Sequence, residues 1–239
     1  MKKAAIIVAI VLLVLYLIAG YFIGGLPVAS KIMGSNKPVD LGVEISVDGA
    51  YQGLDALGQP TTVAELQEIV DNPDSFGTVQ TTLTEEEASS LMALNNIPDF
   101  PARLTQIKFN DDGTVESSGI IWLNKFPTFL SRNGVSSEGI EKVMGYIGFM
   151  DSTTYYMKGT FSISNNNVDL NMDSVKVGRI SLPTGIINDN KGSVENTVSN
   201  ILTNNGYNIR SLYVSDGKVN VDMDQPLGSI VPWLHYVQS

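Results

Sequence analysis

The chain has 239 residues, a formal net charge of −10 and no cysteine. Without cysteine it cannot form disulfides, use a catalytic thiolate or bind a metal through sulfur. Nucleic acid repels so acidic a chain, and therefore no nucleic-acid partner is expected.

The first predicted element is a membrane anchor, a run of 23 uncharged residues from Ala4 to Leu26. As a helix it would extend about 35 Å, enough to cross a hydrocarbon core of roughly 30 Å. Lys2 and Lys3 precede it, which predicts a cytoplasmic N-terminus. The alternative is a cleaved signal peptide, although its apolar region usually has only about 7–15 residues. The pattern therefore favours a single-pass cell-membrane protein held in the lipid bilayer by residues 4–26.

The chain divides into three parts, an anchor (1–26), a linker (27–40) and one extracytoplasmic domain (41–239). All 25 acidic residues and 13 of the 15 basic residues follow the anchor, which gives the rest of the chain a net charge of −12. A domain of this size can bury a sufficient core without disulfides.

The N-terminal half of the domain is predicted to mix short strands and capped helices. Alternating apolar residues over 41–47 predict a strand, and 49–60 reads as a loop. Thr62 and Thr84 each begin a capping box, which predicts helices that follow these two residues. Residues 79–83 read as a brief strand between them.

The C-terminal half is dominated by predicted hairpins. The remaining expected elements are a hairpin over 104–123 turning at Asn110–Gly113, a helix from Ser137 to about 150, strands over 153–163 and 168–182, a helix over 193–205 ending at Gly206, and a hairpin over 207–224 turning at Asp216-Gly217.

This order of elements predicts an α+β fold in which a long, twisted antiparallel sheet packs on a few short helices. A helix followed by an Asp-Gly hairpin occurs twice, in residues 84–115 and 193–219. The repeat indicates either an internal pseudo-symmetry or two copies of a common supersecondary unit.

Catalytic and metal-binding patterns are lacking in the sequence. The single histidine, His235, has no nucleophile motif beside it, and Ser215 to Lys218 matches S-x-x-K only within a hairpin turn. The Asn110–Gly113 and Asn188–Gly192 segments do not have calcium-loop spacing. Four strand carboxylates are expected to face solvent: Asp169, Asp173, Asp222 and Asp224. We therefore expect no catalytic residue, no metal site and no cofactor.

Apolar residues outside the regular pattern are the remaining candidates for a site. One set surrounds a strand-to-helix connection and the following helix face, and is expected to line a ligand site: Trp122, Phe126, Phe129, Leu130, Met144, Ile147 and Met150. Trp233, Leu234 and Tyr236 form a candidate interaction tail. The alternative is that both sets close the core.

Several segments resemble membrane-anchored envelope proteins of the YpmS type. These segments are Leu83 to Glu87, the Asn110–Gly113 turn, Lys176 to Pro183 and the closing Ser215–Gly217 turn, together with the anchor and linker. Such proteins are thought to be similar to the SMP/TULIP-like domains, in which a twisted sheet wraps a helix and leaves an apolar groove. The resemblance implies lipid binding by analogy of fold.

The sequence thus predicts a membrane-anchored, non-catalytic extracytoplasmic domain that binds a lipid or another hydrophobic ligand. The alternative is a structural or assembly module that docks another cell-envelope protein. An enzyme acting on a cell-wall polymer is a third interpretation.

Overall fold

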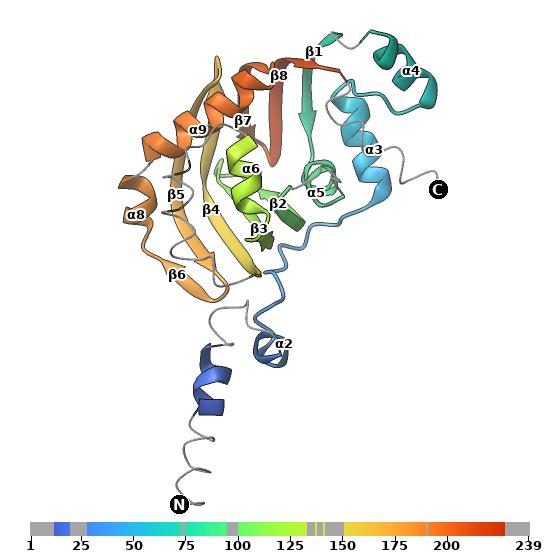
Figure 1. Ribbon diagram of the computed structural model, residues 1–239. Coiled ribbons are helices and arrows are strands. Elements are labelled where there is room, and N and C mark those ends of the chain that lie inside the picture. Colours follow the sequence, from blue (N-terminus) through green and yellow to red (C-terminus); the bar gives the residue numbers. More distant parts are fainter. Residues whose placement is uncertain are drawn as a thin grey trace, which may run out of the picture.

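The computed structural model describes residues 12–19, 28–72, 75–94, 100–132, 137, 141, 151–189 and 191–227. Within these residues the chain is an α+β protein in which helices pack on a curved antiparallel sheet (Figure 1). The strands are β1 (Phe76–Leu83), β2 (Ala102–Phe109), β3 (Val115–Trp122), β4 (Ser152–Ser164), β5 (Asn167–Val177), β6 (Ile180–Leu182), β7 (Asn208–Ser215) and β8 (Lys218–Pro226). The helices are α2 (Ala29–Met33), α3 (Val47–Ala56), α4 (Val63–Asp71), α5 (Glu85–Ala93), α6 (Phe126–Arg132), α8 (Thr184–Asp189) and α9 (Lys191–Asn204).

The eight strands pair in the order β1-β8-β7-β4-β3-β2, while β5 pairs with β4, and β6 with β5. Every one of these pairs is antiparallel. The α+β class and the antiparallel sheet predicted from the sequence are therefore confirmed.

β4 joins the two halves of the sheet. Its residues 152–159 pair with β3, and Ile163 and Ser164 pair with β7. Residues 155–164 also pair with β5, so β7 must share the β3 edge of β4. One 13-residue strand thus has partners on both edges and changes partner along one of them.

The helix-and-hairpin repeat in the sequence is visible in the strand pairing. α5 precedes the β2–β3 hairpin and α9 precedes the β7–β8 hairpin. β1, which directly precedes α5, pairs with β8, the last strand of the second unit. β4, which precedes α9 with β5, β6 and α8 between them, pairs with β3, the last strand of the first unit. The two hairpin turns are also close, because a β-carbon on Gly217 would lie 3.7 Å from Oδ1 of Asp111.

The strand predicted over 41–47 and the loop over 49–60 are wrong, because residues 47–56 form α3. Ser46 caps this helix by accepting a hydrogen bond from the backbone of Gly49. The preceding segment binds the side chain of Gln106 in place of a neighbouring strand: Leu41 N donates to Oε1 at 2.7 Å, and Nε2 donates to Val43 O at 2.9 Å.

The two glycines of α3, Gly49 and Gly53, are where it meets α5. A β-carbon on Gly53 would lie 2.7 Å from Cδ1 of Leu91, and one on Gly49 would lie 2.9 Å from Cγ of Glu86. Glycine costs a helix up to about 1 kcal/mol relative to alanine. Here it allows α3 and α5 to approach more closely than larger residues would.

The second long strand predicted over 168–182 is divided. β5 ends at Val177, and Gly178, with φ of 61°, turns the chain so that β6 pairs back on β5 with Val175 opposite Leu182. Two predicted helix starts and one helix end are confirmed: both capping boxes form at Thr62 and Thr84, and Gly206 has φ of 79° just after α9. The helix predicted from Ser137 to about 150 lies outside the described residues except for residues 137 and 141.

The core lies between the sheet and the helices α3, α5 and α9 (Figure 1). We call the face of the sheet that the helices cover the core face. Leu57, at the end of α3, and Ala88 of α5 pack against buried side chains from this face: Val79, Leu83, Phe109, Ile163, Val168, Ile209, Val219, Val221 and Met223. Strand alternation places the intervening residues on the opposite, outer face.

The segment predicted as a linker is partly folded. It contains α2, and Ala29, Ser30 and Ser35 are at most 2% exposed. Of the predicted anchor, residues 12–19 are described and are helical, and the remainder lies outside the described residues. No helix in the described ranges has both the length and the apolar character needed to cross a membrane.

Gly159 occupies the point where β4 passes from β3 toward β7, opposite an irregularity in β5. A β-carbon there would overlap the carbonyl oxygen of Asn171 and lie 3.0 Å from Cα of Met172. Gly159→Ala is therefore expected to lower the free energy of unfolding by about 2–3 kcal/mol in urea denaturation.

The matched control for this prediction is Gly192→Ala in α9, where a β-carbon would meet nothing within 4 Å. That substitution is expected to be neutral or to stabilise the protein by up to about 1 kcal/mol. Equal urea midpoints for Gly159→Ala and the wild type would contradict the assignment of Gly159 as a packing constraint.

Candidate functional site

The candidate ligand-lining residues on β3 and α6 lie in two different environments. Trp122, the last residue of β3, is 40% exposed, and Nζ of Lys125 lies 5.0 Å from the centre of its ring. Phe129 of α6 is half-buried and packs edge-to-face on Phe100, with ring centres 5.8 Å apart. The structure thus places Trp122 at a surface and gives Phe129 an aromatic partner.

The other candidates lie wholly or partly outside the described part of the chain. Phe126 and Leu130 belong to α6, but their side chains are not among those described. The helix-face residues Met144, Ile147 and Met150 and the tail residues Trp233, Leu234 and Tyr236 lie outside the described residues. Their predicted roles remain predictions.

An apolar groove with a volume of about 310 Å³ lies across β3, β4 and β5. Small-molecule sites usually have volumes of about 300–1,000 Å³, so the groove is at the lower end of that range. The described residues that line it are Ala102, Ile121, Leu123, Thr153, Tyr155, Tyr156, Met157, Val175, Lys176 and Val177.

Strand register explains why these side chains meet. Ile121 is opposite Thr153, Tyr155 is opposite Val177, and Met157 is opposite Val175. Directly paired residues share one face of a sheet, and residues two apart on a strand do so as well. Ile163, which is buried in the core, shares that face of β4, so the groove is the open end of the core face.

The apolar floor continues onto β6. Leu182 is opposite Val175 and Ile180 is opposite Val177, and these side chains are 38% and 42% exposed, respectively. Met157 is also 38% exposed. Large apolar side chains that are exposed and adjacent to one another form an apolar patch, and such patches usually mark binding surfaces.

Tyr155 forms the centre of the floor and has its polar end satisfied. Its hydroxyl lies 3.2 Å from Oγ1 of Thr105 and 3.3 Å from Oγ of Ser117. Gly119 is its cross-strand neighbour, and a β-carbon there would lie 3.0 Å from Cε1 of the tyrosine. A residue larger than glycine at position 119 would push the ring away, so Gly119 keeps the ring against the sheet.

On the outer face behind the groove, polar groups pair with one another. Tyr156 donates its hydroxyl hydrogen to Oε2 of Glu116 at 2.7 Å, and Nζ of Lys158 lies 3.8 Å from Oε1. Burial, together with this acceptor, raises the pKa of Tyr156 to about 12. The same hydrogen bond is the main cause that lowers the pKa of Glu116. Both groups therefore keep their usual charge states near neutral pH.

Of the strand carboxylates predicted to face solvent, Asp169 and Asp173 are exposed, whereas Asp222 and Asp224 are half-buried on the outer face. Asp169 accepts a hydrogen bond from Nζ of Lys191 at 2.6 Å, and Asp222 and Asp224 pair with Arg210. Among the described residues, no group of three or more carboxylate or imidazole side chains could hold a metal ion.

One end of the groove lies close to the segment that follows the predicted anchor. Oγ1 of Thr154 donates to the carbonyl oxygen of Ser35 at 3.1 Å, and Thr154 lies between two groove residues, Thr153 and Tyr155. A β-carbon on Gly34 would lie 3.9 Å from Nη2 of Arg179, in the β5–β6 turn. The contact between Ser35 and Thr154 therefore comes only a few residues after residue 28, where the described chain resumes beyond the predicted anchor.

The groove residues of β4 and β5 were not identified from the sequence as site candidates. The signal was present as alternation, because Tyr155, Met157, Val175 and Val177 share one face of two strands expected to be adjacent. The main contacts of the described helices with the sheet are on β1, β2 and β5. The sequence alone does not reveal that the groove residues of β3 and β4 lie outside these contacts.

Comparison with known proteins found no matching family model, no matching curated protein and no matching solved structure. The likeness to YpmS-type and SMP/TULIP-like proteins therefore remains a prediction from the sequence.

Tyr155→Phe tests the polar attachment of the groove floor. Thr105 is 2% exposed, and its hydroxyl would lose the hydrogen bond to Tyr155. The expected loss is about 1 kcal/mol in the free energy of unfolding.

Tyr213→Phe is the control for this test, because the Tyr213 hydroxyl has no hydrogen-bond partner among the described residues. Its unfolding free energy should stay within about 0.5 kcal/mol of the wild type. Equal effects of the two substitutions would show that the Tyr155 hydroxyl does not fix the floor.

Proposed function

We propose that this chain is a membrane-tethered, non-catalytic protein whose folded body holds the acyl part of a lipid in the groove across β3, β4 and β5. Residues 4–26 are the tether and the body lies outside the cytoplasm. The observation that carries this proposal is the apolar groove with exposed Met157 in its floor.

The composition of the groove favours an apolar ligand. Its central floor consists of Ile121, Met157, Val175 and Val177 beside the ring of Tyr155. Each methylene group that leaves water for such surroundings contributes about 0.8 kcal/mol. Methionine also adapts its shape to flexible chains, which suits a site for acyl groups. The groove has no carboxylate or imidazole among its described lining residues, and the proposal therefore assigns it no reaction.

The position of the groove favours a ligand taken from the membrane. Ser35 follows the predicted anchor closely in sequence and binds the Thr154 side chain, at the end of β4 that carries the groove but on the opposite face of that strand. This contact would keep the end of the sheet that carries the groove near the bilayer in which the chain is anchored. The acyl chain of a membrane lipid is then the most abundant apolar ligand within reach.

Native mass spectrometry of the full-length chain, extracted from membranes in mild detergent, tests the proposal. The wild type is expected to keep a bound lipid, and Met157→Asp is expected to lose it because a carboxylate in the floor is costly to desolvate. The same spectrum tests the tether, since an uncleaved chain has a mass of 25.8 kDa.

Val63→Asp is the matched control, because Val63 is also an exposed apolar residue, at 62%, and lies in the first turn of α4. An acidic residue there is compatible with the helix dipole, so this variant should keep its lipid. A lipid-free wild type, or equal lipid content in both variants, would contradict the proposal. A stoichiometric protein partner cross-linked in cells, with no lipid bound, would favour the assembly module.

A further inference from the structure

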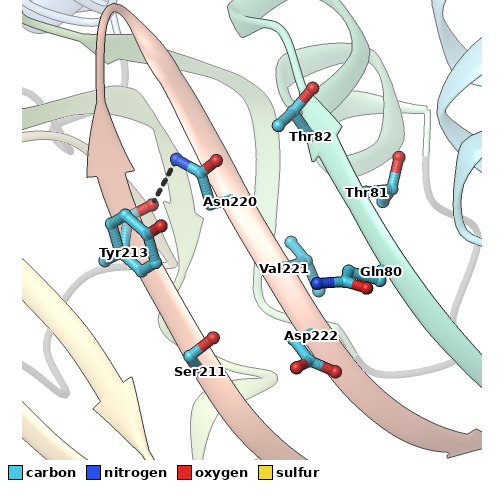
Figure 2. A pocket seen from close by; sticks show the side chains of 8 residues that line it. All are labelled: Gln80, Thr81, Thr82, Ser211, Tyr213, Asn220, Val221 and Asp222. Atoms are coloured by element: carbon cyan, nitrogen blue, oxygen red, sulfur yellow. Dashed lines mark hydrogen bonds between the residues drawn. The ribbon is translucent and has the colours of Figure 1, made fainter.

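A second hollow lies on the outer face of the sheet, across β7, β8 and β1 (Figure 2). Its volume is about 440 Å³. The described residues that line it are Gln80, Thr81, Thr82, Ser211, Tyr213, Asn220, Val221 and Asp222. Val221 belongs to the core, so its neighbours Asn220 and Asp222 project to the opposite side.

The hollow offers neutral hydrogen-bonding groups that have no partner among the described residues. The side chains of Gln80, Thr82, Ser211 and Tyr213 make no hydrogen bond within the described part of the chain. The Asn220 amide is held in place by Oγ of Ser215 at 3.0 Å, and it also reaches the Tyr213 carbonyl (Figure 2). Amides and hydroxyls both donate and accept hydrogen bonds, which is what a polyhydroxylated ligand requires.

The charges at one end of the hollow are already paired. Nε of Arg210 donates to Oδ1 of Asp222, and Nη1 donates to Oδ2 of Asp224, both at 2.7 Å. Hydrogen bonds to the Asp224 carboxylate, chiefly from Arg210 and then from Thr78 and Asn208, lower the pKa of Asp224 to about 2. None of the eight described lining residues is cationic, so an anionic ligand would find no opposite charge there.

Tyr213 adds an exposed aromatic ring to this neutral surface. It is 48% exposed, in the interior of β7 rather than in a loop. The apolar C–H face of a sugar ring can pack on such a ring while its hydroxyls bind the neighbouring amides. Strands lie about 4.8 Å apart, so Tyr213 on β7 and Thr82 on β1, which are in register through Asn220, are separated by about 10 Å, and Gln80 lies two residues further along β1. This span suits a short run of sugar rings better than a single ring.

The backbone beneath the hollow is well supported. Val79, Val219, Val221 and Met223 alternate with the lining residues and are buried in the core. A register shift between Ile209 and Ser211 places a bulge at Arg210, and a bulge of this kind increases local twist. The backbone positions from which the side chains of the hollow project are therefore set before any ligand arrives.

We infer that this hollow binds a neutral, extended, β-linked oligosaccharide, with Tyr213 stacking on a sugar ring and Gln80, Thr82, Ser211 and Asn220 binding its hydroxyls. An extended β-linked chain can lie flat on three strands, whereas an α-linked chain coils away from them. The site is on the face opposite the groove, so its test is independent of lipid binding.

Isothermal titration calorimetry on the full-length chain in detergent tests this inference with three probes: cellotetraose, chitotetraose and the α-linked maltotetraose. At least one β-linked probe is expected to bind, and maltotetraose is expected to bind at least tenfold more weakly. Tyr213→Leu and Gln80→Ala should each weaken binding of that probe about tenfold. The matched control is Gln52→Ala, at an exposed glutamine on α3, which should bind like the wild type.

Failure of both β-linked probes to bind would overturn the inference, as would equal binding of maltotetraose. Wild-type binding by both Tyr213→Leu and Gln80→Ala would also overturn it. If Tyr213→Leu does not fold, the binding of Gln80→Ala alone tests the inference. Gln80 is exposed and its side chain makes no hydrogen bond among the described residues, so this variant is expected to fold.

Discussion

The pairing of β4 on both of its edges is the constraint on which the rest of this structure depends. β3 and β7 follow one another along one edge, and β5 occupies the other. A strand can change partner in this way only if its neighbours diverge. Pairing with β3 ends at Gly159, where the register with β5 also shifts and the carbonyl of Asn171 occupies the space of a side chain. The two halves of the sheet, the enclosed core and the open groove all follow from this single strand.

The same arrangement separates two surfaces with different chemistry. On the core face, the end of β4 near Ile163 is covered, whereas Tyr155 and Met157 face the groove. The free edge of β5 is protected where α8 and α9 approach it, because Asn188 binds both backbone groups of Met172 and Glu195 accepts from Leu170 N. These side chains substitute for another strand and leave only the region near Val175 and Val177 to pair with β6. A sheet edge protected in this way does not invite aggregation, and exposed Met157, Ile180 and Leu182 lie together where β4, β5 and β6 pair.

Local signals predicted much of the fold. The capping boxes at Thr62 and Thr84 and the turns at Asp112-Gly113 and Asp216-Gly217 depend on residues within a few positions of one another, and the sequence therefore reveals them. α3 was missed because its glycines are explained only by α5, more than 30 residues away. The same limit applies to Gln106, whose side chain provides the bonds that a strand partner would give to Leu41 and Val43.

The site was harder to predict than the fold, for a related reason. Trp122 and Phe129 were chosen for their apolar character, but the face on which a strand residue lies is decided by pairing, and Ile121 rather than Trp122 lines the groove. Cross-strand register also brings Tyr155 and Met157 of β4 next to Val177 and Val175 of β5, which lie 22 and 18 positions further along the chain. The polar hollow on the outer face is less visible still in the sequence, since alternating polar residues are ordinary for a half-buried sheet.

Photochemical cross-linking in native membranes tests the central claim most directly. A phospholipid with a diazirine in its acyl chain would be incorporated, activated by light and located by peptide mapping of the full-length chain. The account predicts adducts in residues 153–157 and 175–177 of the groove, in addition to those in the anchor. Adducts confined to residues 4–26 would mean that lipid merely surrounds the anchor, and that the body does not hold it.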